Sequence, residues 1–302
     1  MTGPGHPPFG ARLRAAMQAH GPLCAGIDPH ASMLADWGLS DTPAGLETFA
    51  LRCVEAFAGQ VACVKPQSAF FERFGSAGIA VLERVLADCR DSGTLAILDV
   101  KRGDIGSTMD GYAQAYLGPR SPLRADAMTL SPFLGYGSLR PALDLAARTG
   151  RGVFVLALTS NPEGPGVQHA TPVTAETQPP AGSVAGRIVA GAAADNAEAG
   201  RAGVLGSVGL VVGATVGDAV ADLGLDLAGA NAPLLAPGVG AQGGTAADLR
   251  RVFGPALTNV LASSSREVLA AGPQVEELRQ AAGRTAAALR GMLSGDEHPT
   301  DS

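Results

Sequence analysis

Short apolar runs alternate with longer amphipathic stretches along the chain, which is the pattern of repeated strand and helix units around a parallel sheet. Eight of the apolar runs have the length of buried strands. These candidate strands are residues 23–27, 62–65, 95–101, 127–130, 153–159, 208–213, 234–236 and 259–262. Eight such strands predict an α/β fold of the (β/α)8 type, a TIM barrel, rather than an open sheet.

Helical spacing of apolar residues fills the intervals between the candidate strands. The clearest stretches are residues 45–58, 79–91, 139–149, 184–199 and 246–252. A doubly wound nucleotide-binding sheet is disfavoured, because no G-x-G-x-x-G motif follows the first strand.

One domain accommodates nearly all of the 302 residues, since barrels of this kind often reach about 250 residues or more. We expect it to span residues 1–293. Residues 161–183 are rich in Pro, Thr and Gly with little periodicity, which predicts a lid-like insertion. Residues 294–302 are expected to form a disordered tail.

Composition narrows the choice of partners. Apolar residues make up 46% of the chain and charged residues 17%, which suits a large buried core. A net charge of −6 without a polybasic run argues against nucleic-acid binding. The Pro- and Gly-rich start lacks the apolar centre of a secretory signal, and no apolar run is long enough to span a bilayer. We therefore expect a cytoplasmic protein that does not bind a membrane.

The four cysteines, Cys24, Cys53, Cys63 and Cys89, each lie in an apolar segment and show no C-x-x-C spacing. The sequence therefore predicts buried free thiols. A zinc site is disfavoured, because the short paired spacings of structural zinc ligands are missing.

Polar residues follow the apolar runs repeatedly, and the carboxyl ends of barrel strands are where such folds hold their active sites. The most informative case is Asp-Val-Lys-Arg-Gly-Asp at 99–104. Alternation along a strand points Asp99 and Lys101 the same way, while Asp104 falls in the following loop. Two carboxylates bracketing one ammonium would keep Lys101 protonated, as a fixed proton source rather than a Schiff-base nucleophile. A structural ion-pair cluster is the alternative.

Two further strand ends carry charge. Asp28 follows the first strand, where it could accept hydrogen bonds from sugar hydroxyls or cap the next helix. Lys65 ends the second strand, where it could bind substrate, neutralise Asp28 and Asp99, or do both.

A glycine-rich segment, Ala-Pro-Gly-Val-Gly-Ala-Gln-Gly-Gly at 236–244, follows the seventh strand, and Ser-Ser-Ser-Arg at 263–266 follows the eighth. This pair of loops commonly holds a phosphate in such barrels, through backbone N–H groups and a helix N-terminus. Arg266 would add a bidentate charged contact. Glycines that serve tight turns are the alternative.

Together these residues resemble the orotidine 5'-phosphate decarboxylase family, in particular its longer microbial branch. The resemblance runs from about residue 23 to 273 and is strongest at 64–72, 98–105, 159–164 and 236–244. It implies a carboxy-lyase that converts orotidine 5'-phosphate to UMP and CO2 in pyrimidine biosynthesis, without a metal or an organic cofactor.

The resemblance also implies a homodimer with shared sites. Lys65, Asp99 and Lys101 of one subunit would be joined by Asp104 of the other, whose Ile105 and Thr108 would line the same pocket. The remaining substrate contacts that it implies are Asp28 and Lys65 with the ribose, Ser160 with the pyrimidine, and Gln242 and Arg266 with the phosphate, helped by backbone near Pro237 and Gly240. Ser265 stands where the shorter branch has glycine, and Gln168 is a candidate contact from the insertion.

Two rival functions stay open. A Mg-dependent sugar-phosphate lyase or aldolase of the same barrel type, such as a hexulose-phosphate synthase, also uses a D-x-K-x-x-D strand. Lys65 and Gln67 disfavour it, because an acidic ligand would be expected near that strand end. The second rival is a catalytically silent barrel that binds a nucleotide. The intact Asp99, Lys101 and Asp104 disfavour it, since a cluster of charges is costly to keep.

Overall fold

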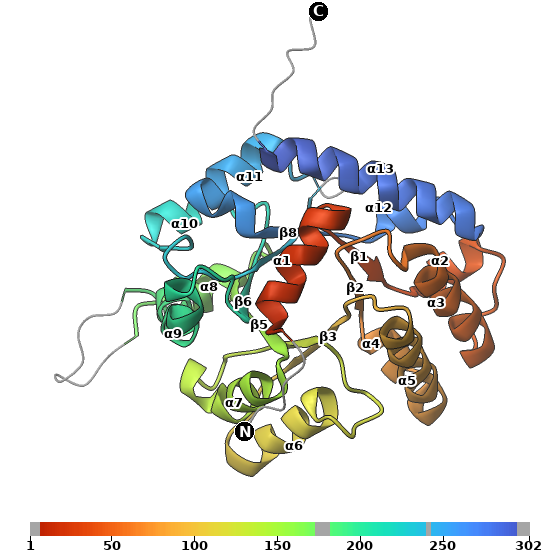
Figure 1. Ribbon diagram of the computed structural model, residues 1–302, viewed down its shortest axis with the longest axis horizontal. Helices are drawn as coiled ribbons and strands as arrows, with labels where there is room; N and C mark the ends of the chain where they lie inside the picture. The colour runs from red at the N-terminus through yellow and green to blue at the C-terminus, as the bar shows by residue number, and fades with distance from the viewer. Residues whose placement is uncertain (1–6, 173–181, 240–242, 295–302) are drawn as a thin grey trace, which may run out of the picture.

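Eight parallel strands form the centre of the molecule in this computed structural model, which describes residues 7–172, 182–239 and 243–294 (Figure 1). The strands are β1 (Leu23–Ile27), β2 (Cys63–Pro66), β3 (Ile97–Arg102), β4 (Ala127–Leu130), β5 (Gly152–Leu158), β6 (Val208–Val212), β7 (Leu234–Pro237) and β8 (Val260–Ser264). Their order is β2-β1-β8-β7-β6-β5-β4-β3.

Hydrogen bonds between the two end strands close the sheet into a barrel. The N–H of Val64 donates to the carbonyl of Leu95 at 2.9 Å, and the N–H of Ser68 donates to the carbonyl of Asp99 at 3.2 Å. The predicted (β/α)8 fold is confirmed, and every predicted strand agrees with the observed one to within two residues at each end.

Helices pack around the barrel, most of them in a ring (Figure 1). They are α1 (Phe9–His20), α2 (Ala31–Asp36), α3 (Pro43–Phe57), α4 (Ala69–Glu72), α5 (Gly75–Asp91), α6 (Gly106–Leu117), α7 (Arg140–Thr149), α8 (Gly164–Gln168), α9 (Val184–Arg201), α10 (Ala219–Asp222), α11 (Ala246–Phe253), α12 (Arg266–Leu269) and α13 (Val275–Ser294), with 3-10 turns η1 (Tyr136–Leu139) and η2 (Gly254–Asn259). The five predicted helices correspond to α3, α5, α7, α9 and α11. None of the helices in the described ranges combines the length and the hydropathy that a membrane span requires.

Strand alternation divides the core into two layers. Residues such as Leu98 and Val100 pack outward against the helices, while Cys24, Ile97 and Phe154 fill the barrel interior. The interior cluster includes Phe9, Leu13 and Met17 of α1, which recur at the i, i+4 spacing of one helix face.

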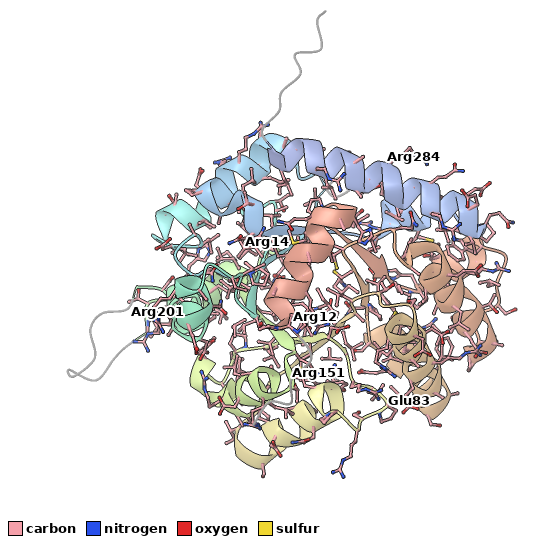
Figure 2. All side chains as sticks on the ribbon, viewed as in Figure 1. Arg12, Arg14, Glu83, Arg151, Arg201 and Arg284 are labelled. Carbon is pink, nitrogen blue, oxygen red and sulfur yellow. The ribbon has the colours of Figure 1, made fainter. Side chains whose placement is uncertain are left out.

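Helix α1, which the sequence pattern did not predict, covers the amino ends of the strands and lies across the barrel in Figure 1. The rings of Phe9 and Phe154 meet edge to face at 6.0 Å between centroids. Arg12, which projects from α1 in Figure 2, pairs with Asp126 at 2.5 Å. With this end of the barrel filled by apolar side chains, the polar strand ends gather at the other.

The predicted insertion at 161–183 is described only in part. Residues 164–168 form the short helix α8, where the sequence showed little periodicity, and residues 173–181 lie outside the described part of the chain. At the carboxyl end, α13 continues to Ser294, so the predicted tail begins where the helix ends, and residues 295–302 also lie outside the described ranges.

Candidate active site

A pocket of about 310 Å³ opens at the carboxyl ends of the strands. Strand alternation explains part of its polar lining, because some of the polar residues lie two positions beyond a residue of the apolar interior. Asp99 follows Ile97 in this way, and Lys65 follows Cys63. The predicted site residues that line the pocket are Asp28, Lys65, Asp99, Lys101, Ser160, Pro237, Ser265 and Arg266.

Asp99 is the centre of a charge network in this pocket. Its Oδ2 accepts a hydrogen bond from Lys65 Nζ at 2.9 Å, and its Oδ1 accepts one from Lys101 Nζ at 2.6 Å. Thr129 Oγ1 donates a third hydrogen bond, to Oδ1, at 2.8 Å. The side chains of Lys65 and Asp99 are each 8% exposed, whereas the Lys101 side chain is 46% exposed. Lys101 is therefore the network's ammonium that faces the open pocket.

The network keeps its two buried members charged. Burial by itself would raise the pKa of Asp99, but the ammonium groups of Lys65 and Lys101 outweigh it and lower that pKa to about 2. Burial would lower the pKa of Lys65, but the carboxylates of Asp28 and Asp99 raise it above its ordinary value. At neutral pH Asp99 is thus an anion and Lys65 a cation, which makes Lys65 unsuited to act as a free amine nucleophile.

Asp28 enters the pocket with an incomplete hydrogen-bond shell. Its Oδ1 is buried and has no partner among the described residues. Helix α2 has His30, not Asp28, at its N-cap, so the capping alternative is not realised. A buried carboxylate oxygen without a donor is costly, and a ligand hydroxyl in the pocket would relieve that cost.

Asp104, Ile105 and Thr108 do not line the pocket of their own chain. Asp104 Oδ1 accepts the hydrogen bond of the Ile105 N–H at 2.8 Å, and the Ile105 side chain is 61% exposed. Spacing predicted that two carboxylates would bracket Lys101. Within one chain Asp99 pairs with Lys101, but Asp104 does not line the same pocket. The loop that carries Asp104 and Ile105 ends at Gly106, where α6 begins with a φ of +54°, a conformation that favours glycine.

The end of β7 and the loop after β8 also line the pocket, through Pro237, Ser265 and Arg266. Ser265, which stands in place of the expected glycine, is accommodated by Gly26 of β1. A Cβ on residue 26 would lie 1.8 Å from Ser265 Oγ, closer than any tolerated contact. The predicted contacts Gly240 and Gln242 lie outside the described residues.

Sequence reasoning missed Thr129 and Glu267 as lining residues, and it gave no role to Thr159 and Asn161 within the segment 159–164 or to Ser263 and Ser264 within the predicted phosphate loop. A signal existed for Thr129, which is a hydroxyl within an otherwise apolar strand and is 1% exposed. Gln168, a candidate substrate contact, forms hydrogen bonds with Thr159, the residue that follows β5. Its amide accepts from the Thr159 N–H at 2.9 Å and donates to Thr159 Oγ1 at 2.7 Å.

All four cysteines are buried and free, which confirms the prediction from their apolar surroundings. Burial raises the pKa of the Cys89 thiol to about 12, so it stays protonated. Among the residues with described positions, no three His, Cys, Asp or Glu side chains are grouped to hold a metal ion.

Comparison with known proteins places this arrangement in a family. Residues 21–281 match the sequence model of the Orotidine 5'-phosphate decarboxylase / HUMPS family. This chain belongs to that family. It is similar to proteins named orotidine 5'-phosphate decarboxylase from Streptomyces coelicolor, with 58% identity over 94% of this chain and 97% of that protein, and from a Nocardioides species, with 60% identity over 87% and 92%.

A solved structure supports the same relationship. The crystal structure titled as a putative orotidine 5'-phosphate decarboxylase from Streptomyces avermitilis superposes with a TM-score of 0.89. It is 55% identical in sequence and covers 98% of both chains. The pocket described above therefore lies in a barrel shared along its length with members of this family.

Proposed function

We propose that this chain is an orotidine 5'-phosphate decarboxylase, a lyase that converts orotidine 5'-phosphate to UMP and CO2 in pyrimidine biosynthesis. The observation that carries the proposal is the Lys65–Asp99–Lys101 network, fixed in the pocket of a chain that belongs to this family. Relatives of 58% and 60% identity bear the name of this activity.

The substrate's charges and hydroxyls match the groups that line the pocket. The phosphate would bind Arg266 and backbone N–H groups near Pro237, at the end of β7 and the loop after β8. The ribose hydroxyls would donate to Asp28, whose buried oxygen lacks a partner among the described residues, and would lie close to Lys65. Ser160 would contact the pyrimidine edge.

The chemistry would be carried out by charged side chains whose positions are fixed before the substrate binds. When the bond from C6 to the carboxylate breaks, CO2 leaves and the electron pair stays on C6, where the ring does not delocalise it. The Lys101 ammonium, held 2.6 Å from Asp99, would stabilise this carbanion and then transfer a proton to C6. Binding of the remote phosphate would help to organise the site around the reacting carbon.

A homodimer would complete the site. Among the described residues, large apolar side chains are exposed at Ile105 (61%), Phe133 (80%) and Leu134 (54%), on the loops that follow β3 and β4. Apolar side chains exposed to this degree are typical of a protein interface. We infer that a second copy covers them and brings its own Asp104, Ile105 and Thr108 to Lys101 of the first copy.

Mixed dimers test this sharing. Lys101→Ala and Asp104→Ala chains are each expected to be nearly inactive, yet their co-expression gives hybrids with one intact site. Random pairing makes half of the dimers hybrid, so about a quarter of wild-type activity should return. Hybrids without activity would contradict the shared site.

The insertion at 161–183 is proposed to act as a lid over the pocket. Asn161 lines the pocket, and Gln168 holds Thr159 beside it, so the start of the insertion adjoins the pocket. Closure of a loop on the phosphate is a common way to exclude water.

The chain is also proposed to work in the cytoplasm. Its buried, unpaired cysteines suit a reducing compartment.

The decisive assay is the absorbance change when purified protein meets orotidine 5'-phosphate in EDTA. Loss of the orotate chromophore with release of CO2 supports the decarboxylase. Turnover that appears only after Mg²⁺ is added, with a sugar phosphate as substrate, would favour the metal-dependent lyase. Nucleotide binding without any turnover would favour the silent barrel.

A further inference from the structure

Thr129 occupies an irregular place in the barrel, opposite a bulge in β3. Leu98 pairs with Met128 and Arg102 pairs with Leu130, so three residues of β3, 99 to 101, lie opposite Thr129 alone. The bulge interrupts the regular ladder at Asp99 and Lys101, the two residues that β3 contributes to the charge network. Bulges next to active sites commonly redirect a side chain.

The hydroxyl of Thr129 bridges both ends of this bulge. It accepts a hydrogen bond from the backbone N–H of Lys101 at 2.9 Å and donates one to Asp99 Oδ1 at 2.8 Å. The single hydroxyl proton is thereby committed to Asp99, and an oxygen lone pair to Lys101. Thr129 is 1% exposed, so water does not replace these bonds.

Lys101 has a backbone conformation that needs such support. Its φ is +44°, in the left-handed region that residues with a Cβ seldom adopt. Conformations of this kind persist where the surroundings hold them from both sides. Thr129 holds the amide of Lys101, while the next residue, Arg102, is anchored by its ion pair with Glu72 at 2.5 Å.

We propose that Thr129 is a positioning residue of the reaction, whose hydroxyl holds the strained backbone of Lys101 and the carboxylate of Asp99 in one fixed arrangement. The consequence is that the Lys101 ammonium reaches the reacting carbon without rearrangement of its main chain. The inference deepens the proposed decarboxylase function and rests on it for its kinetic consequences, whereas the local rigidity it describes can be measured without turnover.

Two variants of Thr129 separate the hydroxyl from the bulk of the side chain, and a third variant, at another position, is the control. Thr129→Val keeps the shape and removes the hydroxyl, and Thr129→Ser keeps the hydroxyl. Thr94→Val is the matched control, since Thr94 is also buried at 7% exposure but precedes β3 at the other end of the strand. Its hydroxyl lies 3.1 Å from that of Ser92.

The kinetic readout is the split between kcat and affinity. We expect Thr129→Val to lower kcat by about 10- to 100-fold, the effect of unpairing buried polar groups, with UMP affinity within about threefold of wild type. As the pH is lowered, the kcat of Thr129→Val should also begin to fall at a higher pH than that of wild type. The reason is that Asp99 loses a hydrogen bond that favours its charged form. Thr129→Ser and Thr94→Val should stay within about threefold in kcat.

The structural readout is hydrogen exchange of the peptide covering residues 97–102, which should quicken in Thr129→Val but not in Thr129→Ser. Unchanged exchange and a kcat within twofold in Thr129→Val would overturn the proposal, as would a Ser variant as damaged as the Val variant. Absence of turnover in the unmodified chain would refute the proposed function instead, and hydrogen exchange would still decide whether Thr129 holds the bulge.

Discussion

Replacing Asp99 by asparagine tests whether the charge network is as buried and as tightly coupled as the structure shows. The pKa of Asp99 is lowered from 3.8 to about 2, and each pKa unit corresponds to about 1.4 kcal/mol. The charged form therefore stabilises the fold by about 2 kcal/mol at neutral pH. Because the folded pKa is the lower one, this stability is present above pH 3.8 and is lost as the pH falls towards 2.

Asparagine keeps the shape of Asp99 but leaves Lys65, at 6% exposure, facing one carboxylate instead of two. Breaking a buried pair in this way costs about 3 kcal/mol or more, so the free energy of unfolding at pH 7 should fall by about that amount. The gap between wild type and variant should narrow by about 1 kcal/mol at pH 3, where part of the wild-type advantage has already been lost.

Urea unfolding followed by fluorescence measures this difference, because the chain has one tryptophan, Trp37, packed against Phe49 with ring centroids 4.1 Å apart. Glu47→Gln is the control, since it breaks an ion pair with Arg84 whose side chains are 57% (Arg84) and 39% (Glu47) exposed. Exposed pairs contribute less than about 1 kcal/mol. If Asp99→Asn costs no more than this control, the network is solvated in solution and the reasoning from burial is wrong.

Three other predictions follow from the pocket and the core. Arg266→Ala should weaken UMP binding by about 10- to 100-fold in calorimetry while uridine binding stays unchanged, and equal losses for both would contradict a phosphate contact. Gly26→Ala should lower the stability of the fold and the affinity for nucleotide, because the added Cβ clashes with Ser265. Adding Ser265→Gly should restore stability. A double variant as unstable as Gly26→Ala would show that another contact is responsible. A thiol reagent should label no cysteine in the native chain and all four in urea, and rapid native labelling would refute their burial.

Strands were predictable because a buried parallel strand is an apolar run bounded by polar residues, and β1 and β4 matched in both bounds. Helix α6 was missed because two glycines and several exposed polar residues weaken its apolar face. Helix α1 was missed because its apolar face is a single i, i+4 row. Its packing across the amino end of the barrel depends on contacts with Phe154 and Gly152, which are distant in sequence.

The gathering of Asp28, Lys65, Asp99 and Arg266 in one pocket was predictable from strand ends alone, because parallel strands in a barrel bring their carboxyl ends together. The bulge opposite Thr129 was not, since a change of register depends on the partner strand and leaves no local signal. Regular alternation also did not predict that Asp104 would lie outside the pocket of its own chain and accept a hydrogen bond from the N–H of Ile105.

Lys101→Ala provides the most direct test that the ammonium fixed by Asp99 performs the chemistry on a bound nucleotide. Turnover of orotidine 5'-phosphate and calorimetric binding of UMP should be measured on the same preparations of wild type and variant. We predict that kcat falls by about 10⁴-fold or more, because proton donation and charge stabilisation are lost together, while UMP still binds with measurable affinity. A variant that retains turnover within tenfold of wild type would contradict the assignment of Lys101 as the proton donor.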